Sequence, residues 1–208
     1  MKKLKTAVLI SGRGSNLQAL IDSCGAADFP AEIALVISNL PHALGLERAH
    51  KAGIPALTIR NRDYPTREAF DAALNEALRQ AGAEFICLAG FMRLLGPDFV
   101  RRWEGRIVNI HPSLLPEFKG LQVHERVLEA GAAVSGCSVH FVTAELDDGP
   151  NIVQEKVPVL AGDTVEALSA RVLAAEHRIY PQALRLVAEG RVRLENGKAV
   201  FSQRSPDR

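Results

Sequence analysis

The chain has 208 residues, a length that fits one sizeable domain. Its formal net charge is only +1, and this balance argues against a basic nucleic-acid-binding protein and against an acidic disordered one. The three cysteines are far apart in the sequence and form no CxxC pair, which argues against a disulfide framework and against a cysteine-rich metal site.

The N-terminus carries lysines followed by an apolar run, as a signal peptide does. The apolar run at residues 6–10 is short, however, and ends at Ser11-Gly12 without a longer hydrophobic region. No stretch of about 18 apolar residues occurs anywhere in the sequence, so no membrane span is expected. We therefore expect a cytoplasmic protein.

Short apolar runs alternate with helix-periodic segments along the N-terminal half. Strands are expected at 6–10, 33–37, 56–59 and 85–89. Helices are expected after Ser15 or Asn16, either of which can act as an N-cap, around 45–51, and from the cap Thr66 to Gly82. This alternation predicts an α/β fold: a Rossmann-like, mostly parallel sheet with helices on both faces.

The pattern changes after about residue 105. Strands are expected at 106–110, 138–142 and 152–159, the last two antiparallel, with a helix at 123–130. A long helix begins at Asp163 or Thr164, where Asp163 and Glu166 have the spacing of a capping box. Pro181 is expected to kink or break it. Asn196-Gly197 predicts a type I′ hairpin, and the tail 205–208 is expected to fray.

A glycine-containing loop, Ser11-Gly12-Arg13-Gly14-Ser15-Asn16, follows the first strand and precedes the first helix. Two glycines allow close approach of backbone N–H groups, and a helix N-terminus favours an anion. Leu17 stands where a dinucleotide fingerprint needs a third glycine, and no Gly-Lys-Ser/Thr follows. The loop is a candidate monophosphate cradle; the spacing fits a tight turn with Ser15 as a cap equally well.

Asn109 and His111 are two residues apart on an expected strand, so their side chains point to the same side. An amide and an imidazole that reach one oxygen can stabilise an oxyanion. Asp147, on the turn 147–150, is a candidate partner that would raise the pKa of His111 and favour imidazolium. The alternative is structural: Asn109 caps the loop, His111 satisfies backbone groups, and Asp147 forms an Asx-turn.

Four motifs occur in a characteristic order: SGRGSN at 11–16, LAGFMRLL at 88–95, NIHPSLLP at 109–116, and GCSVHFV at 136–142 leading to LDDGP at 146–150. With these motifs the chain resembles the phosphoribosylglycinamide formyltransferase family. The resemblance extends over nearly the whole chain, through residues 175–177 of the last long helix. It implies a single formyltransferase domain, with a phosphate-binding half at about 1–105 and a catalytic and folate-binding half at about 106–208.

The resemblance implies that the amine of glycinamide ribonucleotide attacks the formyl carbon of 10-formyltetrahydrofolate in de novo purine synthesis. The folate is a cosubstrate, and no metal is implied. The partners would be these small molecules, without nucleic acid or membrane. A monomer and a homodimer both remain open.

The resemblance also implies roles for particular residues. Asn109 and protonated His111 would hold the oxyanion, and Asp147 would keep His111 charged. The residues implied for the ribonucleotide are Gly14, Ser15, Asn16, Leu173, Ala174, Ala175 and Glu176. The residues implied for the folate are Arg67, Met92, Arg93, Leu94, Leu95, Asn109, Thr143, Ala144, Glu145, Leu146 and Asp147. The chain departs from the family pattern at Ala144, which replaces an acidic residue, and at Gln122, which replaces a histidine or similar polar residue.

For three other polar residues the sequence alone favours a structural role. Arg93 is expected to be a surface arginine, His140 a buried histidine of the core, and His124 a solvent-facing residue at a helix start. Glu176 would be read as a solvated charge without the resemblance.

Three alternatives compete with the ribonucleotide formyltransferase. A 10-formyltetrahydrofolate hydrolase uses the same Asn/His/Asp logic with water, but carries an additional N-terminal domain and has no use for a phosphate loop. A methionyl-tRNA formyltransferase should carry a C-terminal RNA-binding domain and more positive charge. A non-enzymatic module that binds a phosphorylated metabolite would need the loop but not Asn109, His111 and Asp147 together.

Overall fold

The apolar run at residues 6–10 forms the C-terminal part of β1 (Leu4–Ile10), a central strand in the first of two units of the chain. The computed structural model describes residues 2–202, and the two units are Met1–Val108 and Asn109–Arg208. The tail 205–208, expected to fray, lies outside the described residues.

Four parallel strands form the sheet of the N-terminal unit, in the order β3-β2-β1-β4. They are β1, β2 (Ala31–Ser38), β3 (Ala56–Thr58) and β4 (Phe85–Leu88). Val8 of β1 is opposite Val36 of β2 and Cys87 of β4, and all three side chains are fully buried. Burial on both faces explains why these strands are continuously apolar in sequence, and it confirms the predicted parallel sheet.

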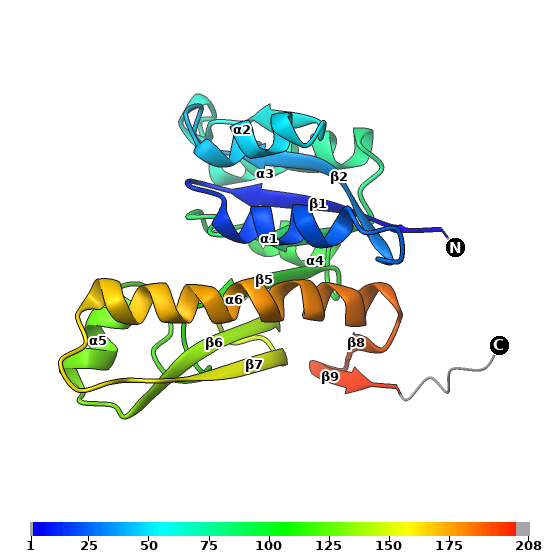
Figure 1. The fold of residues 1–208 in the computed structure, drawn as a ribbon. Helices are drawn as coiled ribbons and strands as arrows, with labels where there is room; N and C mark the ends of the chain where they lie inside the picture. Colours follow the sequence, from blue (N-terminus) through cyan, green and yellow to red (C-terminus); the bar gives the residue numbers. More distant parts are fainter. Residues whose placement is uncertain (1, 203–208) are drawn as a thin grey trace. The chain divides into compact units, whose positions relative to one another are not determined.

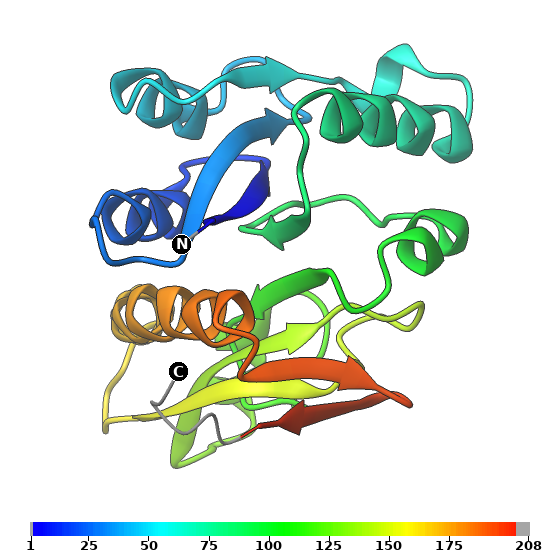
Figure 2. The same cartoon turned by 90° about the vertical axis from the view of Figure 1, so that its right-hand side faces the viewer.

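Helices cover both faces of this sheet, with α1 (Ser15–Cys24) and α2 (Leu44–Lys51) on one face and α3 (Arg67–Gln80) on the other (Figures 1 and 2). Thr66 caps α3 as expected, because its hydroxyl accepts from the Ala69 N–H at 3.2 Å. The expected cap of α1 is wrong: Gly14 is the N-cap, in a left-handed conformation, without a side-chain cap bond. The short elements η1 (Asn61–Asp63) and α4 (Pro97–Arg102) were not expected, since neither has room for a helical repeat.

The C-terminal unit is built on the end of β5 (Ile107–His111), on β6 (Val134–Phe141) and on β7 (Asn151–Pro158). β6 and β7 pair antiparallel as predicted, although β6 begins four residues before the expected 138. α5 (Val123–Glu129) precedes them in sequence. β8 (Val192–Glu195) and β9 (Lys198–Phe201) form a separate hairpin; Asn196 and Gly197 both have positive φ, as a type I′ turn requires.

The long helix α6 (Val165–Ala188) runs along β6 and β7 (Figure 1) and differs from expectation at two points. It continues through Pro181, because Pro181, Ala183 and Leu184 are all buried and their packing offsets the lost backbone bond. The capping box is also absent: Thr164 is the N-cap and accepts from the Ala167 N–H, while Asp163 is bound to Arg171 at 2.8 Å.

The predicted fold class is confirmed: a mostly parallel α/β part followed by an antiparallel part. Among the helices that the structure describes, none combines the length and apolar character needed to cross a membrane.

The close pairing of β6 and β7 generates a stability prediction at Gly136. A Cβ at this position would lie 2.2 Å from the Glu155 backbone oxygen, so one strand would have to move. We expect Gly136→Ala to lower the free energy of unfolding by about 2 kcal/mol or more, the scale of overpacking against a rigid neighbour. Urea denaturation measures this change.

Gly12→Ala is the matched control, because a Cβ at Gly12 meets nothing within 4 Å. Equal stability of the two variants would contradict the steric argument.

Candidate active site

The end of β5 presents Asn109 and His111 to the same side of the strand, as their spacing predicts. His111 is buried, with 5% of its surface exposed, and Asn109 is half-buried. Both belong to the C-terminal unit, and so does Asp147, on the turn between β6 and β7.

Asp147 makes the contacts that hold this cluster together. Its Oδ2 lies 3.3 Å from Nδ1 of His111 and accepts from the Gly120 N–H at 3.0 Å. Its Oδ1 accepts from the Asn109 amide at 3.5 Å. The expected contact between Asp147 and His111 is therefore present, and the same carboxylate reaches Asn109.

The turn at 147–150 dictates where this carboxylate lies. Asp147 has φ of 48°, a left-handed conformation that Asp tolerates better than most residues. Gly149 is required two residues later, because a Cβ there would lie 1.7 Å from the Phe141 backbone oxygen. The Asp-Asp-Gly-Pro sequence thus supplies both the Asp147 carboxylate and the turn that orients it.

The loop 118–120 covers the other side of His111. The Phe118 carbonyl accepts from Nε2 of His111 at 3.0 Å, and Lys119 forms an ion pair with Asp148. Phe118 itself has φ of 52°, an unusual conformation for a bulky residue. Arg126 of α5 donates to the Lys119 carbonyl at 2.6 Å and so supports this loop.

The two ring nitrogens of His111 both face oxygens that can only accept: a carboxylate at Nδ1 and a carbonyl at Nε2. Only the imidazolium donates from both nitrogens. Burial nevertheless lowers the pKa of His111 below its ordinary value, although the Phe118 carbonyl and the Asp147 charge act to raise it. The expectation of a raised pKa is wrong in net direction, because the cost of burying the charge exceeds the attraction of the carboxylate.

The pKa of Asp147 is lowered. Burial alone would raise it, but the contact with His140, the Gly120 N–H and the charges of His111 and His140 together outweigh that effect. Asp147 is therefore ionised at neutral pH, and a buried anion lies beside the imidazole.

His140 on β6 belongs to the same cluster, which the sequence did not reveal. Its Nδ1 lies 2.9 Å from the Phe141 carbonyl, and its Nε2 lies 3.3 Å from the Asn109 amide and 3.7 Å from Oδ1 of Asp147. It is buried, as expected for a core histidine, but its polar atoms support Asn109 and Asp147. The only available signal was its alternation with Ser138 along the strand.

The candidate phosphate loop lies in the N-terminal unit, between β1 and α1. A cavity of about 340 Å³ is lined by Ser11, Gly12, Arg13, Gly14, Ser15, Asn16, Ala89, Gly90 and Met92. Gly14 has φ of 69°, and a Cβ there would lie 2.6 Å from Cα of Gly45. Glycine is therefore required at position 14 for the fold itself, so a substitution there would not test ligand binding alone.

The residues implied for the folate are mostly at the surface. In the N-terminal unit, Arg67, Met92, Arg93 and Leu94 are exposed, and the Met92 N–H donates to Oγ of Ser11 at 2.8 Å. The segment ends at Gly96, whose N–H donates to the buried Asp71 carboxylate at 2.7 Å. Arg93 is thus a surface arginine, as expected.

In the C-terminal unit, Ala144, Glu145 and Leu146 are exposed and Thr143 is half-buried. Leu146 has 56% of its surface exposed although it is apolar, which suits contact with a flat ring.

The α6 segment 173–176, implied for the ribonucleotide, has both exposed and buried members. Ala174 is exposed and Leu173 half-buried, whereas Ala175 and Glu176 are buried. The sequence alone predicted that Glu176 is solvated, and this prediction is wrong because the side chain is buried, which is unusual for a glutamate. His124, expected to face solvent, is half-buried, and its Nδ1 is buried without a hydrogen-bond partner in the described part of the chain.

No disulfide joins Cys24, Cys87 or Cys137 within the described part of the chain, and burial raises the pKa of both Cys24 and Cys137 to about 12, so neither of these two is a reactive thiolate. Within residues 2–202, no group of three His, Cys, Asp or Glu side chains is arranged to hold a metal ion.

The fold and this cluster define an α/β enzyme in which an amide, an imidazole and a carboxylate converge at the end of a strand. The sequence profile of the formyl transferase family matches residues 4–184. Phosphoribosylglycinamide formyltransferase of Escherichia coli is 47% identical over 98% of this chain and 96% of its own length. The chain therefore belongs to the formyl transferase family, among the phosphoribosylglycinamide formyltransferases.

A solved structure agrees with this assignment. Glycinamide ribonucleotide transformylase 1 from Symbiobacterium toebii superposes with a TM-score of 0.93 at 52% identity, covering 96% of this chain and 94% of that one. The trifunctional purine biosynthetic protein adenosine-3 of Bos taurus is 57% identical over 96% of this chain. The chain spans 20% of the length of that relative.

The lowered pKa of His111 generates a prediction about stability and pH. In the unfolded chain histidine takes up a proton near its ordinary pKa of 6.5, whereas the pKa values of folded His111 and half-buried His124 are lower. The unfolded state therefore binds more protons, and stability should fall as the pH decreases from about 7 through 6.5 towards the folded pKa values.

Urea denaturation at pH 7 and pH 5 measures this loss, which should be smaller in His111→Gln and unchanged in His50→Gln, a control at an exposed histidine of α2. An unaltered loss in His111→Gln would show that His111 does not contribute.

Proposed function

We propose that the protein transfers the formyl group of 10-formyltetrahydrofolate to the primary amine of glycinamide ribonucleotide. The products are N-formylglycinamide ribonucleotide and tetrahydrofolate, a step of de novo purine synthesis. The observation that carries the proposal is the convergence of Asn109 and His111 on one side of β5, with Asp147 in contact with both. Family membership and the names of the relatives support the acceptor, and the folate donor is our inference from the family.

The reaction needs donors for a developing oxyanion. Attack of the amine nitrogen on the formyl carbon converts the carbonyl oxygen to an alkoxide in a tetrahedral intermediate. The Asn109 amide and Nε2–H of protonated His111 donate to this oxygen, where preorganised donors act strongly. Collapse of the intermediate breaks the bond to N10 of the folate, which takes up a proton as it leaves, while the attacking amine loses one.

Asp147 supports these steps through His111. Its carboxylate stabilises the imidazolium at Nδ1 and so opposes the effect of burial on the pKa of His111. Asp147 also assists proton transfer from the attacking amine, directly or through water. Because the Phe118 carbonyl occupies Nε2 of His111, a reacting oxygen must replace that carbonyl, so the loop 118–120 must yield during binding.

Substrate binding is assigned as the family resemblance implies. Gly14, Ser15 and Asn16 bind the phosphate through backbone N–H groups and the N-terminus of α1, and the α6 segment 173–176 contacts the ribonucleotide. The folate is bound by Arg67, by residues 92–95, by Asn109 and by residues 143–147. The reaction as written requires no metal. We further propose a cytoplasmic enzyme that acts on small molecules and is a monomer or homodimer.

A single assay separates this function from its alternatives. The protein is mixed with 10-formyltetrahydrofolate, with and without glycinamide ribonucleotide, and deformylation of the folate is followed by absorbance. Turnover that requires the ribonucleotide supports the proposal. Turnover without it indicates a hydrolase, and no turnover in either mixture indicates a binding module.

His111 carries the donor in this mechanism, so His111→Ala should lower kcat at least ~100-fold, the usual scale for a lost acid-base or oxyanion group. Steady-state rates at saturating substrates measure the effect, with His50→Ala as the control at an exposed position. A rate near that of the wild type would remove His111 from the mechanism.

Ser15 tests the phosphate loop without disturbing Gly14. Ser15→Ala removes one hydroxyl donor, so KM for the ribonucleotide should rise about tenfold while KM for the folate stays within about twofold, as for one lost hydrogen bond to a charged group. Ser23→Ala, near the other end of α1, is the matched control. Equal changes in both KM values would mean that the loop is only structural.

A further inference from the structure

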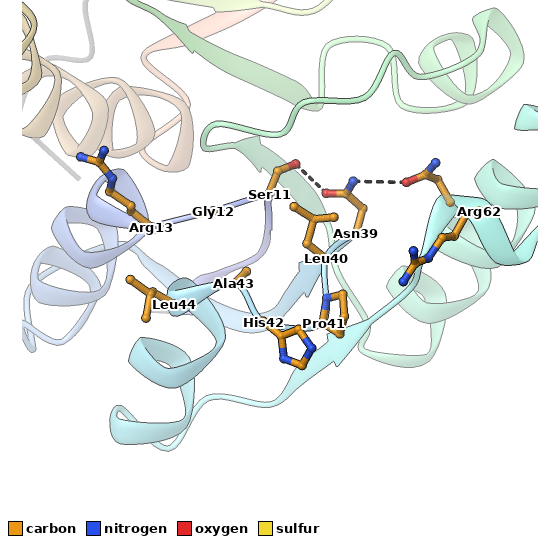
Figure 3. A pocket seen from close by; sticks show the side chains of 11 residues that line it. Ser11, Gly12, Arg13, Asn39, Leu40, Pro41, His42, Ala43, Leu44 and Arg62 are labelled. Atoms are coloured by element: carbon orange, nitrogen blue, oxygen red, sulfur yellow. Dashed lines mark hydrogen bonds between the residues drawn. The ribbon is translucent and has the colours of Figure 1, made fainter.

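A second cleft lies beside the phosphate loop, in the N-terminal unit. It has a volume of about 570 Å³, in the usual range of small-molecule sites, and we name it the Asn39 cleft (Figure 3). It is lined by Ser11, Gly12, Arg13, Asn39, Leu40, Pro41, His42, Ala43, Leu44, Asn61 and Arg62. The proposed reaction uses none of the residues 39–44, 61 and 62.

The cleft opens where β1 and β2 end, which is where ligands bind in parallel α/β sheets. Asn39 directly follows β2. In dinucleotide-binding sheets an acidic residue near this position bonds the ribose hydroxyls, and an arginine there accommodates a ribose phosphate instead. Asn39 is neutral and Arg62 lies nearby, so the position suits a phosphorylated ribose.

The floor of the cleft is an ordered polar relay. The Ser11 hydroxyl donates to Oδ1 of Asn39 at 2.6 Å, and the Asn39 amide donates to Oδ1 of Asn61 at 3.3 Å (Figure 3). Ser11 and Asn39 are buried, with 6% and 5% of their surfaces exposed. The relay fixes Asn61 through its oxygen and leaves its NH₂ group available to donate to a ligand.

The charged side chains among the described residues that line the cleft are the arginines Arg13 and Arg62. His42 and Arg62 are exposed, and within residues 2–202 neither forms an ion pair and none of the residues that line the cleft is Asp or Glu. The neighbouring Asp63 is bound to Arg60 at 2.6 Å, so it does not neutralise Arg62. In Figure 3 the side chains of Arg13 and His42 both lie well apart from that of Arg62, which leaves Arg62 as the cation beside Asn39.

The remaining wall is apolar. Leu40 and Leu44 have 48% and 53% of their surfaces exposed, and Pro41 and Ala43 lie between them in sequence. Exposed aliphatic side chains in a cleft that also holds an arginine suit a ligand with a flat, weakly polar ring at one end and a phosphate at the other.

We propose that the Asn39 cleft binds a nucleoside monophosphate, separately from the ribonucleotide at the phosphate loop. The phosphate is held by Arg62, a ribose hydroxyl accepts from the Asn61 amide, and the base packs on Leu40 and Leu44. Ser11, Gly12 and Arg13 line both cavities. A nucleotide bound in the Asn39 cleft would therefore be able to affect ligand binding at the phosphate loop.

Calorimetric titration of the full chain tests this proposal. Adenosine monophosphate is the probe, with adenosine and inorganic phosphate as separate ligands. The nucleotide should bind at least about tenfold more tightly than either, because each part supplies only some of the contacts. Arg62→Ala should weaken nucleotide binding about tenfold or more, the scale of a lost charge-assisted hydrogen bond.

Two variants make the result specific. Arg60→Ala, on the same segment but outside the cleft, should leave nucleotide affinity within about twofold, and so should Ser15→Ala in the phosphate loop. If Ser15→Ala abolishes binding while Arg62→Ala does not, the nucleotide occupies the phosphate loop and the proposal fails. Equal affinity for phosphate and nucleotide, or no binding at millimolar concentration, also overturns it. Because no arm measures formyl transfer, failure here leaves the proposed function untouched.

Discussion

The buried carboxylate of Asp147 is the constraint around which the C-terminal unit is organised. A buried ion is costly unless it is fully bonded, roughly several kcal/mol when its partners are absent. Asp147 meets this demand with His111, Asn109, the Gly120 N–H and His140. These groups come from β5, from the loop 118–120 and from β6, so satisfying one anion fixes three separate segments.

Two opposing effects act on the pKa of His111. Burial favours the neutral imidazole, while the oxygens at both ring nitrogens favour the imidazolium. The balance places the pKa of His111 below its ordinary value, and a change in hydrogen bonding at either ring nitrogen would shift this pKa. Exchange of the Phe118 carbonyl for a substrate oxygen is such a change, so ligand binding and protonation of His111 are coupled in the proposed mechanism.

The N-terminal unit gathers its polar groups at the carboxyl end of its parallel sheet. The loop after β1 offers backbone N–H groups at a helix N-terminus, and the end of β2 offers amides and cations. Gly14 is needed at the first site because Gly45 lies within 2.6 Å of where its Cβ would be, so the packing of α1 and α2 shapes the loop. Ser11 connects both features through its bonds to Asn39 and Met92.

The sequence by itself determined the parallel sheet, the hairpin at Asn196-Gly197 and the Asn109–His111 face, because each follows from local periodicity or local turn chemistry. It could not determine the cap of α1, the continuity of α6 through Pro181 or the role of His140, since each is decided by packing against distant residues. The sequence also could not determine the net direction of the pKa shift of His111. Asp147 was a candidate partner that the family resemblance implied, but the cost of burying the imidazolium is set by surrounding atoms that only the tertiary structure brings together.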